Sequence, residues 1–523
     1  MMCLPYSDEN INQKKQMEFD RATNAKRAIV SGLLFKVISI IGPFLMRTLI
    51  IYTLGNLYLG LSSLFTSILN ALNLAELGIG SALVFTMYRP VADDNKERVG
   101  ALLNVYRLAY YAIGIIVLIC GVAIVPFIPN MIHGEYPGEI NIYYVYLIHL
   151  AATTSGYFFM GYRSSILQAY QRSDVINSVT IVMDLLTYSM QAIALIGFRN
   201  YYLYVLILLF RSVGINLVIS FITHKKFGDI IPTGKISIQE KKQILQKTGA
   251  LIGHKVGTVV VNSVDNILIS AYIGLNIVAV YNNYFFIFTA LSGMFLMLTN
   301  GLTSIIGNYI IQKDQSEING LFNNIHIYLA LTVCFCCTCL FTMFQPFISA
   351  WTGNNSLLPF SSVILFTLYF FIVKIKTVGL LFKDAAGLWE KDVLKPYIQI
   401  AIDLVIDLVL LRAIGINGAI ISSIACMIFG FFYETIVVFR YCLKKSPNHY
   451  YFNTALYFFA TVISCTVSMI ICGVFSGESS VIKTLLHFIV SAFVSILVFA
   501  ISTFWTKDFS HAVRYLRLKF RSR

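Results

Sequence analysis

Long apolar runs recur from one end of the chain to the other, and they constrain its fold more than any other feature. Each run has about twenty residues, which is enough for a helix to cross a hydrocarbon core about 30 Å thick. Hydrophobic residues make up 57% of the chain and charged residues only 12%, outside the usual range of soluble globular proteins. No polar stretch is long enough for a separate soluble domain. The pattern predicts an all-α polytopic membrane protein.

The apolar runs divide into about fourteen predicted transmembrane helices. They cover residues 29–52, 58–86, 101–126, 142–162, 175–197, 201–222, 248–272, 277–311, 321–345, 358–380, 396–412, 415–439, 450–473 and 482–505. The N-terminal residues are polar and lack the apolar core of a secretory signal peptide.

Basic residues gather almost entirely in alternate loops, whereas the opposite face receives little more than Arg199 and Arg412. The positive-inside rule then places both termini in the cytoplasm. The net charge of +14 is explained by this topology, so it does not indicate a nucleic-acid partner.

The polar interruption at 223–247 divides the chain into six spans and eight. A shift of 219 residues aligns Lys36 with Lys255 and Gly55 with Gly274, which indicates a parallel repeat of two pseudo-symmetric six-helix lobes. Two-lobed transporters of this kind hold their substrate path in a central cavity. The predicted parts are a cytoplasmic tail at 1–28, an N-terminal lobe at 29–222, a basic cytoplasmic linker at 223–247, a C-terminal lobe at 248–440, an additional helix pair at 450–505 and a basic cytoplasmic tail at 506–523.

The first predicted span carries two cations, Lys36 and Arg47, in an otherwise apolar run. They are eleven residues apart, so a helix places them on one face, roughly 16 Å apart along its axis. A charge inside a span costs at least about 2.5 kcal/mol unless it faces protein, water or a partner. The spacing predicts a cationic stripe facing a polar path. The alternative for Lys36 is an ion pair with Glu76 at a similar depth in the next span.

Lys255 corresponds to Lys36 in the repeat, but no acid stands where Glu76 would correspond. Flanked by His254, Lys255 is the stronger candidate to meet an anionic ligand. Arg211 and Asp184 both lie near the middle of their spans, which predicts a buried ion pair, with Arg211 on the substrate path as the alternative.

Three acids inside the C-terminal spans are candidate ion-coupling residues. Asp403 and Asp407 are four residues apart and so share one helix face, where they require a cation, a proton or a lysine. Lys374 and Lys376, near the end of the preceding span, are the lysine candidates. Asp265 either balances Lys255 or binds a coupling cation. We expect Glu434 to lie near the membrane interface.

No catalytic or metal site is predicted. The ten cysteines lie mostly within apolar runs, where thiols act as small hydrophobic groups. His133, Glu135 and Glu139 share one outer loop, where a solvated turn is the expected arrangement. Nothing matches a nucleotide-binding loop, and no cofactor is expected.

Several stretches resemble the bacterial polysaccharide exporters of the O-antigen flippase type, within the multidrug/oligosaccharidyl-lipid/polysaccharide (MOP) superfamily. The similar parts are Arg47, the Leu54-Gly55 turn with Gly60, the stretch "LAELGIGSAL" at 74–83 and "VDNILISAYIGLNIVAVYN" at 264–282. The family arginine of the first helix matches Arg47, whereas Lys36, Lys255 and Arg211 are cations in comparable places. The chain departs from the twelve-span pattern of the family, and extra C-terminal helices also occur in the lipid II flippases of the superfamily.

The resemblance implies a transporter and not an enzyme: a flippase that moves undecaprenyl-diphosphate-linked oligosaccharide across the bacterial cytoplasmic membrane. Its expected partners are this lipid-linked cargo, the bilayer, and the polymerase and glycosyltransferases of surface polysaccharide synthesis. The alternatives are a membrane-embedded polymerase or ligase and, within the superfamily, a lipid II flippase or a multidrug exporter. The excess of cations over acids in the first-lobe spans disfavours an exporter of cationic drugs.

Overall fold

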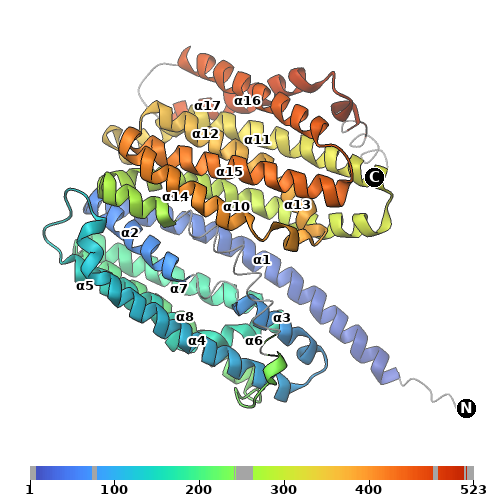
Figure 1. Ribbon diagram of the computed structural model, residues 1–523. Helices are drawn as coiled ribbons and strands as arrows, with labels where there is room; N and C mark the ends of the chain where they lie inside the picture. Colours follow the sequence, from blue (N-terminus) through green and yellow to red (C-terminus); the bar gives the residue numbers. More distant parts are fainter. Residues whose placement is uncertain are drawn as a thin grey trace, which may run out of the picture. The chain divides into compact units, whose positions relative to one another are not determined.

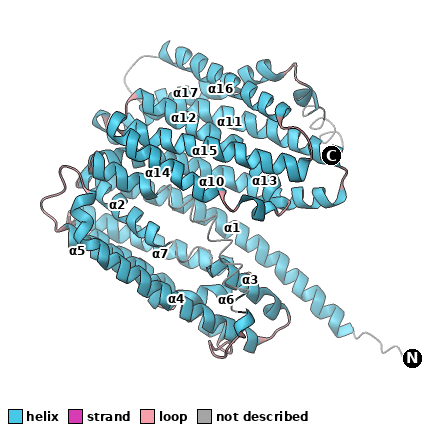
Figure 2. Ribbon diagram, viewed as in Figure 1, coloured by secondary structure: helices cyan, strands magenta, loops and turns pink. Residues whose placement is uncertain are grey.

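The computed structural model describes residues 8–73, 79–240, 242, 263–474, 481–511 and 514, with side chains from residue 27 onward at most of these positions. Every regular element in these ranges is helical (Figure 2). The chain forms two compact units, Met1–Val259 and Val260–Arg523.

The described part of the N-terminal unit contains eight α-helices and two short 3₁₀ turns (Figure 1). They are α1 (Asp8–Thr53), α2 (Asn56–Leu72), α3 (Ile79–Ala92), α4 (Lys96–Ile124), η2 (Val125–Met131), α5 (Ile142–Phe158), η3 (Gly161–Arg163), α6 (Ser164–Ala169), α7 (Ser173–Ile196) and α8 (Tyr201–Phe227). Within this unit α8 packs against both α5 and α7, and α7 in turn packs against α1.

The C-terminal unit begins, in its described part, with a helical segment at 263–272. It continues with α10 (Leu275–Gln312), α11 (Gln315–Thr352), η4 (Asn354–Ser356), α12 (Phe360–Ile375), α13 (Thr377–Ala385), η5 (Leu388–Asp392), α14 (Lys395–Ile414), α15 (Ile416–Val438), η6 (Phe439–Leu443), α16 (Asn448–Val474) and α17 (Val481–Thr503). The additional pair α16 and α17 packs against α11 (Figure 1).

Ten helices in the described residues are long and apolar enough to cross a membrane. The protein is therefore all-α and polytopic, as predicted, whereas the count of fourteen spans stays a prediction. The predicted span 58–86 is described as two helices, α2 and α3, on either side of residues 74–78. The shorter helices α2 and α5, with 17 residues each, explain part of the difference in count.

The repeat predicted from the sequence recurs as one backbone turn in each unit. Gly55 has a φ of 99° and Gly274 a φ of 123°, a region that favours glycine because it has no side chain. The Gly55 amide donates to the Ile50 carbonyl at 2.9 Å, and the Gly274 amide donates to the Ile269 carbonyl at 3.0 Å. Ile50 and Ile269 are both buried. The two glycines end one helix and begin the next in the same way.

A close contact between α1 and α7 holds the first helix to its unit. A Cβ at Gly42 would lie 2.1 Å from the Tyr188 ring, so only glycine allows the two helices to approach at this point. Asn177 of α7 donates to the Ser31 hydroxyl of α1 at 3.2 Å. These contacts fix the face that α1 presents to α7.

Candidate functional site

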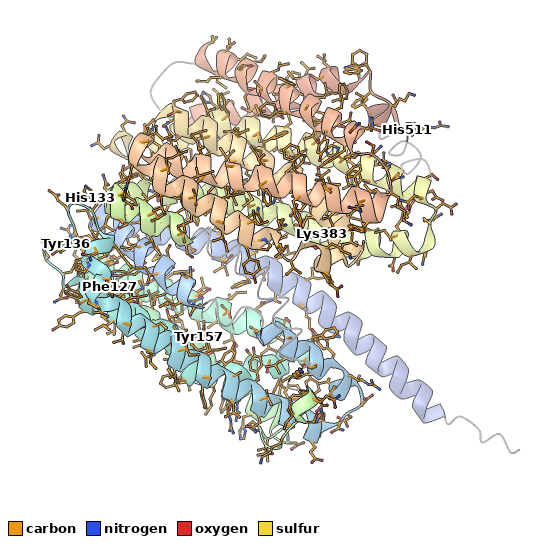
Figure 3. The ribbon with its side chains drawn as sticks, viewed as in Figure 1. Phe127, His133, Tyr136, Tyr157, Lys383 and His511 are labelled. Carbon is orange, nitrogen blue, oxygen red and sulfur yellow. The ribbon has the colours of Figure 1, made fainter. Side chains whose placement is uncertain are left out.

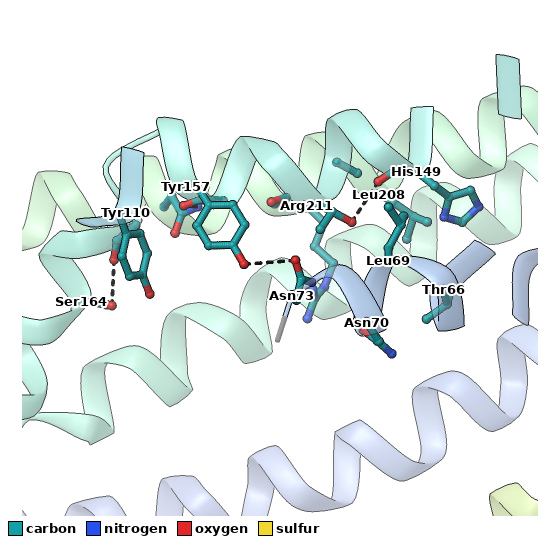
Figure 4. Close-up of a pocket in the computed structure, with 16 residues that line it drawn as sticks. Thr66, Leu69, Asn70, Asn73, Tyr110, His149, Tyr157, Ser164, Leu208 and Arg211 are labelled. Atoms are coloured by element: carbon teal, nitrogen blue, oxygen red, sulfur yellow. Dashed lines mark hydrogen bonds between the residues drawn. The ribbon is translucent and has the colours of Figure 1, made fainter. Parts of the chain in front are cut away.

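A polar pocket lies inside the N-terminal unit, and we call it the N-lobe pocket. Its volume is about 520 Å³, within the range of about 300–1,000 Å³ that is typical of small-molecule sites. Helices α2, α4, α5, α6 and α8 contribute to its wall (Figure 4). The polar side chains that line it are Thr66, Asn70, Asn73, Tyr110, His149, Thr153, Tyr157, Ser164, Arg211, Ser212 and Asn216.

The predicted ion pair between Arg211 and Asp184 is confirmed, and its cation lines the N-lobe pocket. The Arg211 Nε donates to Asp184 Oδ1 at 2.5 Å, across the contact between α8 and α7. The Asp184 side chain is 3% exposed and the Arg211 side chain 37% exposed. The carboxylate is therefore buried behind the guanidinium, which has its exposed part in the pocket.

Aromatic rings and amides form another part of the pocket wall. The Tyr110 and Tyr157 rings meet edge to face at 5.5 Å, and Tyr106 stacks on Tyr110 at 4.7 Å. The Tyr157 hydroxyl donates to Asn73 Oδ1 at 3.1 Å, so α5 holds the amide at the end of α2 in place (Figure 4). The pocket is thus lined by flat rings and by groups that both donate and accept hydrogen bonds.

The sequence analysis singled out only Arg211 among the residues that line this pocket. A signal was present in the spacing of Thr66, Asn70 and Asn73, which recur every three or four residues along an apolar helix. That spacing places them on one helix face. Polar residues repeated on one face of a span indicate a polar cavity more directly than isolated charges do.

The three candidate ion-coupling acids meet in the C-terminal unit, in what we call the acidic cluster. Asp265, Asp403 and Asp407 are 4%, 1% and 0% exposed, and one oxygen from each lies within 4.8 Å of the others. The segment at 263–272 supplies the first acid and α14 the other two. The sequence predicted the shared face of the α14 acids, but not the contact with Asp265.

Hydrogen bonds satisfy only part of the acidic cluster. Asp265 Oδ2 accepts from the Tyr281 hydroxyl at 3.2 Å and from the Ser423 hydroxyl at 3.3 Å. Asp407 Oδ1 accepts from the Ser422 hydroxyl at 2.5 Å. The buried Asp265 Oδ1, Asp403 Oδ1 and Asp407 Oδ2 receive no hydrogen bond within the described part of the chain. Carboxylates this close repel each other, so the arrangement fits shared protons or a hard cation held by oxygen ligands.

The prediction that Lys374 or Lys376 neutralises the α14 acids is wrong. Lys374 lies over the Phe295 and Phe370 rings, at 5.8 and 5.7 Å from their centroids. Lys376 lies 3.9 Å from Glu434 instead. Helix α12 ends at Ile375 and Lys376 begins the next turn, so neither ammonium group pairs with an acid of α14.

Glu434 is the centre of a buried ion network, and its expected depth near the membrane interface stays a prediction. It is 2% exposed and pairs with Lys395 as well as Lys376. Asp392 pairs in turn with Lys395 at 3.3 Å and with Lys383, which Figure 3 labels on α13. We call these five residues the lysine network. Charges this deep require such partners because an unpaired buried ion is costly.

The remaining predicted cations divide between described and undescribed parts of the chain. Lys36 and Arg47 are half-buried on α1, and Arg47 interacts electrostatically with Tyr204 of α8. Lys36 forms no ion pair with another described residue. Lys255, His254 and Glu76 lie outside the described residues, so the pairing of Lys36 with Glu76 stays a prediction.

The helical bundles, the polar pocket and the buried acidic cluster belong to a polytopic membrane protein. Residues 25–302, slightly more than half of the chain, match the family model described as polysaccharide biosynthesis protein. The chain therefore belongs to that family, which confirms the resemblance found in the sequence. Among curated proteins, none matches the chain.

Solved structures show the same fold. The lipid II flippase MurJ in an inward closed conformation gives a TM-score of 0.67 at 14% identity, covering 91% of this chain and 98% of that one. An inward-facing multidrug resistance MATE family transporter of the MOP superfamily gives 0.63 at 14% identity, covering 80% and 99%. A mutant of the Vibrio cholerae MATE transporter VcmN gives 0.53 at 16% identity, covering 82% and 98%. These similarities show a fold that the chain shares with all three structures.

Proposed function

We propose that this protein is a flippase for undecaprenyl-diphosphate-linked oligosaccharide. It moves these units across the bacterial cytoplasmic membrane by alternating access of its two lobes, for surface polysaccharide synthesis. The undecaprenyl chain stays in the lipid while the headgroup crosses along a polar path. Family membership over residues 25–302 supports the pathway, and the similarity to a lipid flippase supports the kind of cargo.

The observation that carries this proposal is the N-lobe pocket, a polar cavity of about 520 Å³ inside a membrane-spanning unit. Buried polar groups are costly in a bilayer unless they are paired or serve a polar substrate. A cavity lined by amides, hydroxyls and one guanidinium fits a hydrophilic headgroup. It does not fit a hydrophobic cation, for which an unpaired acid would be expected in the wall.

The proposed diphosphate path uses the cations that the sequence predicts for the central cavity. Lys36, Arg47, Lys255 and His254 are the candidates, and the proposed topology has about fourteen spans with both termini in the cytoplasm. Lys36 supports this reading because no described acid pairs with it. Fixed ammonium and guanidinium groups compensate a diphosphate that has lost part of its water.

The acidic cluster is the proposed coupling site, where a proton or a sodium ion binds. Three buried carboxylates with three unbonded oxygens support this role. A cation that binds one lobe conformation more tightly than the other shifts their equilibrium by its difference in affinity. Asp265, Asp403 and Asp407 are thereby assigned to energy coupling and not to the cargo.

Proteoliposomes loaded with fluorescent undecaprenyl-diphosphate oligosaccharide test the function. We expect the wild type to move the lipid between leaflets, and Arg47→Ala and Lys255→Ala to slow this movement at least about tenfold, since each removes a charge-assisted contact. Lys313→Ala is the matched control, because Lys313 is exposed and its ion-pair partner among the described residues is Glu317, four positions further on.

The same vesicles separate the alternatives. Sugar-chain growth without lipid movement would replace the flippase by a polymerase or ligase. Equal movement of lipid II would indicate a lipid II flippase, and export of cationic drugs without lipid movement would indicate a multidrug exporter.

A further inference from the structure

We propose that the N-lobe pocket binds uncharged sugar residues rich in hydroxyl and amide groups, and that the diphosphate of the same cargo is held elsewhere. This inference rests on the proposed function and assigns one part of the headgroup to one site. The cargo is thereby read in two places, with its sugar in a charge-balanced pocket and its diphosphate on cations outside that pocket.

The charged groups at the wall of the N-lobe pocket balance each other. Among the described residues, Arg211 is the one lysine or arginine in the pocket wall, and its Nε lies 2.5 Å from Asp184 Oδ1. The pair has no net charge, and the other polar groups of the wall are amides, hydroxyls and one imidazole. A second anion would compete with Asp184 for the guanidinium, whereas an uncharged hydroxyl does not.

The wall of the N-lobe pocket also has donors and acceptors that are available for hydrogen bonds. A guanidinium has five N–H donors, and the bond to Asp184 uses the Nε donor, so both Nη groups are without a described partner. Thr66 and Asn70, one turn apart on α2, are exposed and form no hydrogen bond with another described residue. In Figure 4 the Arg211 side chain extends from α8 toward Asn70 of α2 and Asn73, the residue that follows this helix. Donors and acceptors therefore converge from two helices, as vicinal hydroxyls require.

Two aromatic rings form part of the wall of the N-lobe pocket. Tyr110 and Tyr157 line the pocket with rings 5.5 Å apart, and Tyr157 is fixed by its bond to Asn73. A pyranose has an apolar C–H face and a polar edge of hydroxyls, so a wall with rings beside amides matches both. Inorganic diphosphate has no apolar face and gains nothing from such a wall.

Protection of an engineered thiol tests the inference on the full-length protein in detergent. Asn70→Cys is labelled with a polar maleimide in the presence of a neutral N-acetylglucosamine trisaccharide, a galacturonic acid trisaccharide or inorganic diphosphate. We expect the neutral trisaccharide to slow labelling about threefold or more, and the two anions to leave the rate unchanged. Thr66→Cys is a second reporter at the same wall. Asn130→Cys, on exposed η2, is the control position, and labelling of the parent protein is subtracted.

A lipid assay completes the test. Asn70→Ala should lower the affinity for undecaprenyl-diphosphate trisaccharide about three- to tenfold, the usual effect of losing one or two uncharged hydrogen bonds. Its affinity for undecaprenyl diphosphate without sugar should equal that of the wild type and of Asn130→Ala. Equal loss for both lipids, or protection by diphosphate and not by the neutral sugar, would overturn the inference. Protection by the neutral sugar in a protein that moves no lipid would refute the flippase function and support the sugar site. Lipid movement without protection by the sugar would support the flippase function and refute the sugar site.

Discussion

At the scale of single residues, a charge inside a span is explained by the group that faces it. Arg211 faces Asp184 and the N-lobe pocket, Glu434 faces two lysines, and Asp265 faces two other acids. The first two are structural pairs with a compensated charge. Asp265 has no described cation beside it. This difference separates a candidate coupling site from an ion pair that stabilises the fold.

The Arg211–Asp184 pair predicts an asymmetry between its two alanine variants. Arg211→Ala leaves a carboxylate that is 3% exposed without its cation, whereas Asp184→Ala leaves a guanidinium that is 37% exposed and can be hydrated in the pocket. We expect Arg211→Ala to destabilise the protein by about 2 kcal/mol and Asp184→Ala by about half of that. Thermal unfolding in detergent, followed by fluorescence, measures both. Equal losses of stability in the two variants would mean that the Arg211 side chain is as buried as the Asp184 side chain.

The lysine network gives a second prediction at this scale. Glu434→Gln removes the charge that faces Lys376 and Lys395, so the three ammonium groups of the network are left with one carboxylate, Asp392. We expect a loss of about 3 kcal/mol, visible as a lower unfolding temperature. Glu317→Gln, which breaks an exposed pair with Lys313 on α10–α11, should change stability by less than about 0.5 kcal/mol. A Glu434→Gln protein as stable as Glu317→Gln would show that the lysines are hydrated or neutral.

The residues show which parts of the site were predictable. Arg211 and Asp184 were paired from their depth alone, because neighbouring spans bring residues of equal depth together. Lys374 and Lys376 were assigned to the wrong acids, because depth does not give the rotation of a helix. The turn between α12 and α13 at Lys376 changes that rotation. The sequence has no proline or glycine at Lys376 that would predict this turn.

At the scale of elements, the segment 228–240 of the basic linker is docked on α4. Lys96 pairs with Asp229 at 3.1 Å, and Asn104 donates to the Gly234 carbonyl at 3.0 Å. Arg98 pairs with Glu240, whose carboxylate also accepts from the Ser237 amide at 3.0 Å in a capping box. This segment of the linker is therefore held on the N-terminal unit and is not an unattached tether.

This docking predicts a pH dependence whose sign follows from Glu240. Its hydrogen bonds to Arg98 and Ser237 lower the pKa of the carboxyl to about 2, below the ordinary value of 4.5. A lowered pKa stabilises the docked segment above the ordinary value, and this contribution is lost as the pH falls toward 2. A spin label at Lys235→Cys should therefore keep its mobility from pH 7 to about pH 4.5 and gain mobility below it.

Two variants test the docking of this segment at neutral pH. Glu240→Gln should give the mobile spectrum at pH 7, because the pair with Arg98 is lost. Gly100→Ala should act likewise, since its Cβ would lie 2.4 Å from the Ile231 carbonyl oxygen. A label that becomes mobile between pH 7 and pH 5 in the parent would indicate a different titrating group.

At the scale of the whole molecule, the two units share one backbone turn. Gly55 and Gly274 make the same turn in both units, which a few aligned identities had predicted. The two units differ in their polar contents: the described part of the first holds the N-lobe pocket, and that of the second holds the acidic cluster. Hydropathy predicted the helices because the bilayer fixes their length. It did not predict this division of roles, which depends on which faces meet.

The division of roles predicts that a cation stabilises the protein through the acidic cluster. If sodium binds there, its binding free energy adds to the folding free energy, so about 100 times its dissociation constant stabilises the protein by about 2.7 kcal/mol. Sodium chloride should then raise the unfolding temperature above that in choline chloride at equal ionic strength. Asp407→Asn, which removes one of three carboxylates that are 0–4% exposed, should abolish the difference. Glu317→Gln, on an exposed pair, should retain it. A wild type that shows no sodium effect, but whose lipid movement follows an imposed pH gradient and loses that dependence in Asp407→Asn, would make the coupling ion a proton. If neither sodium nor the gradient has an effect that depends on Asp407, the acidic cluster is structural and the cargo moves down its own gradient.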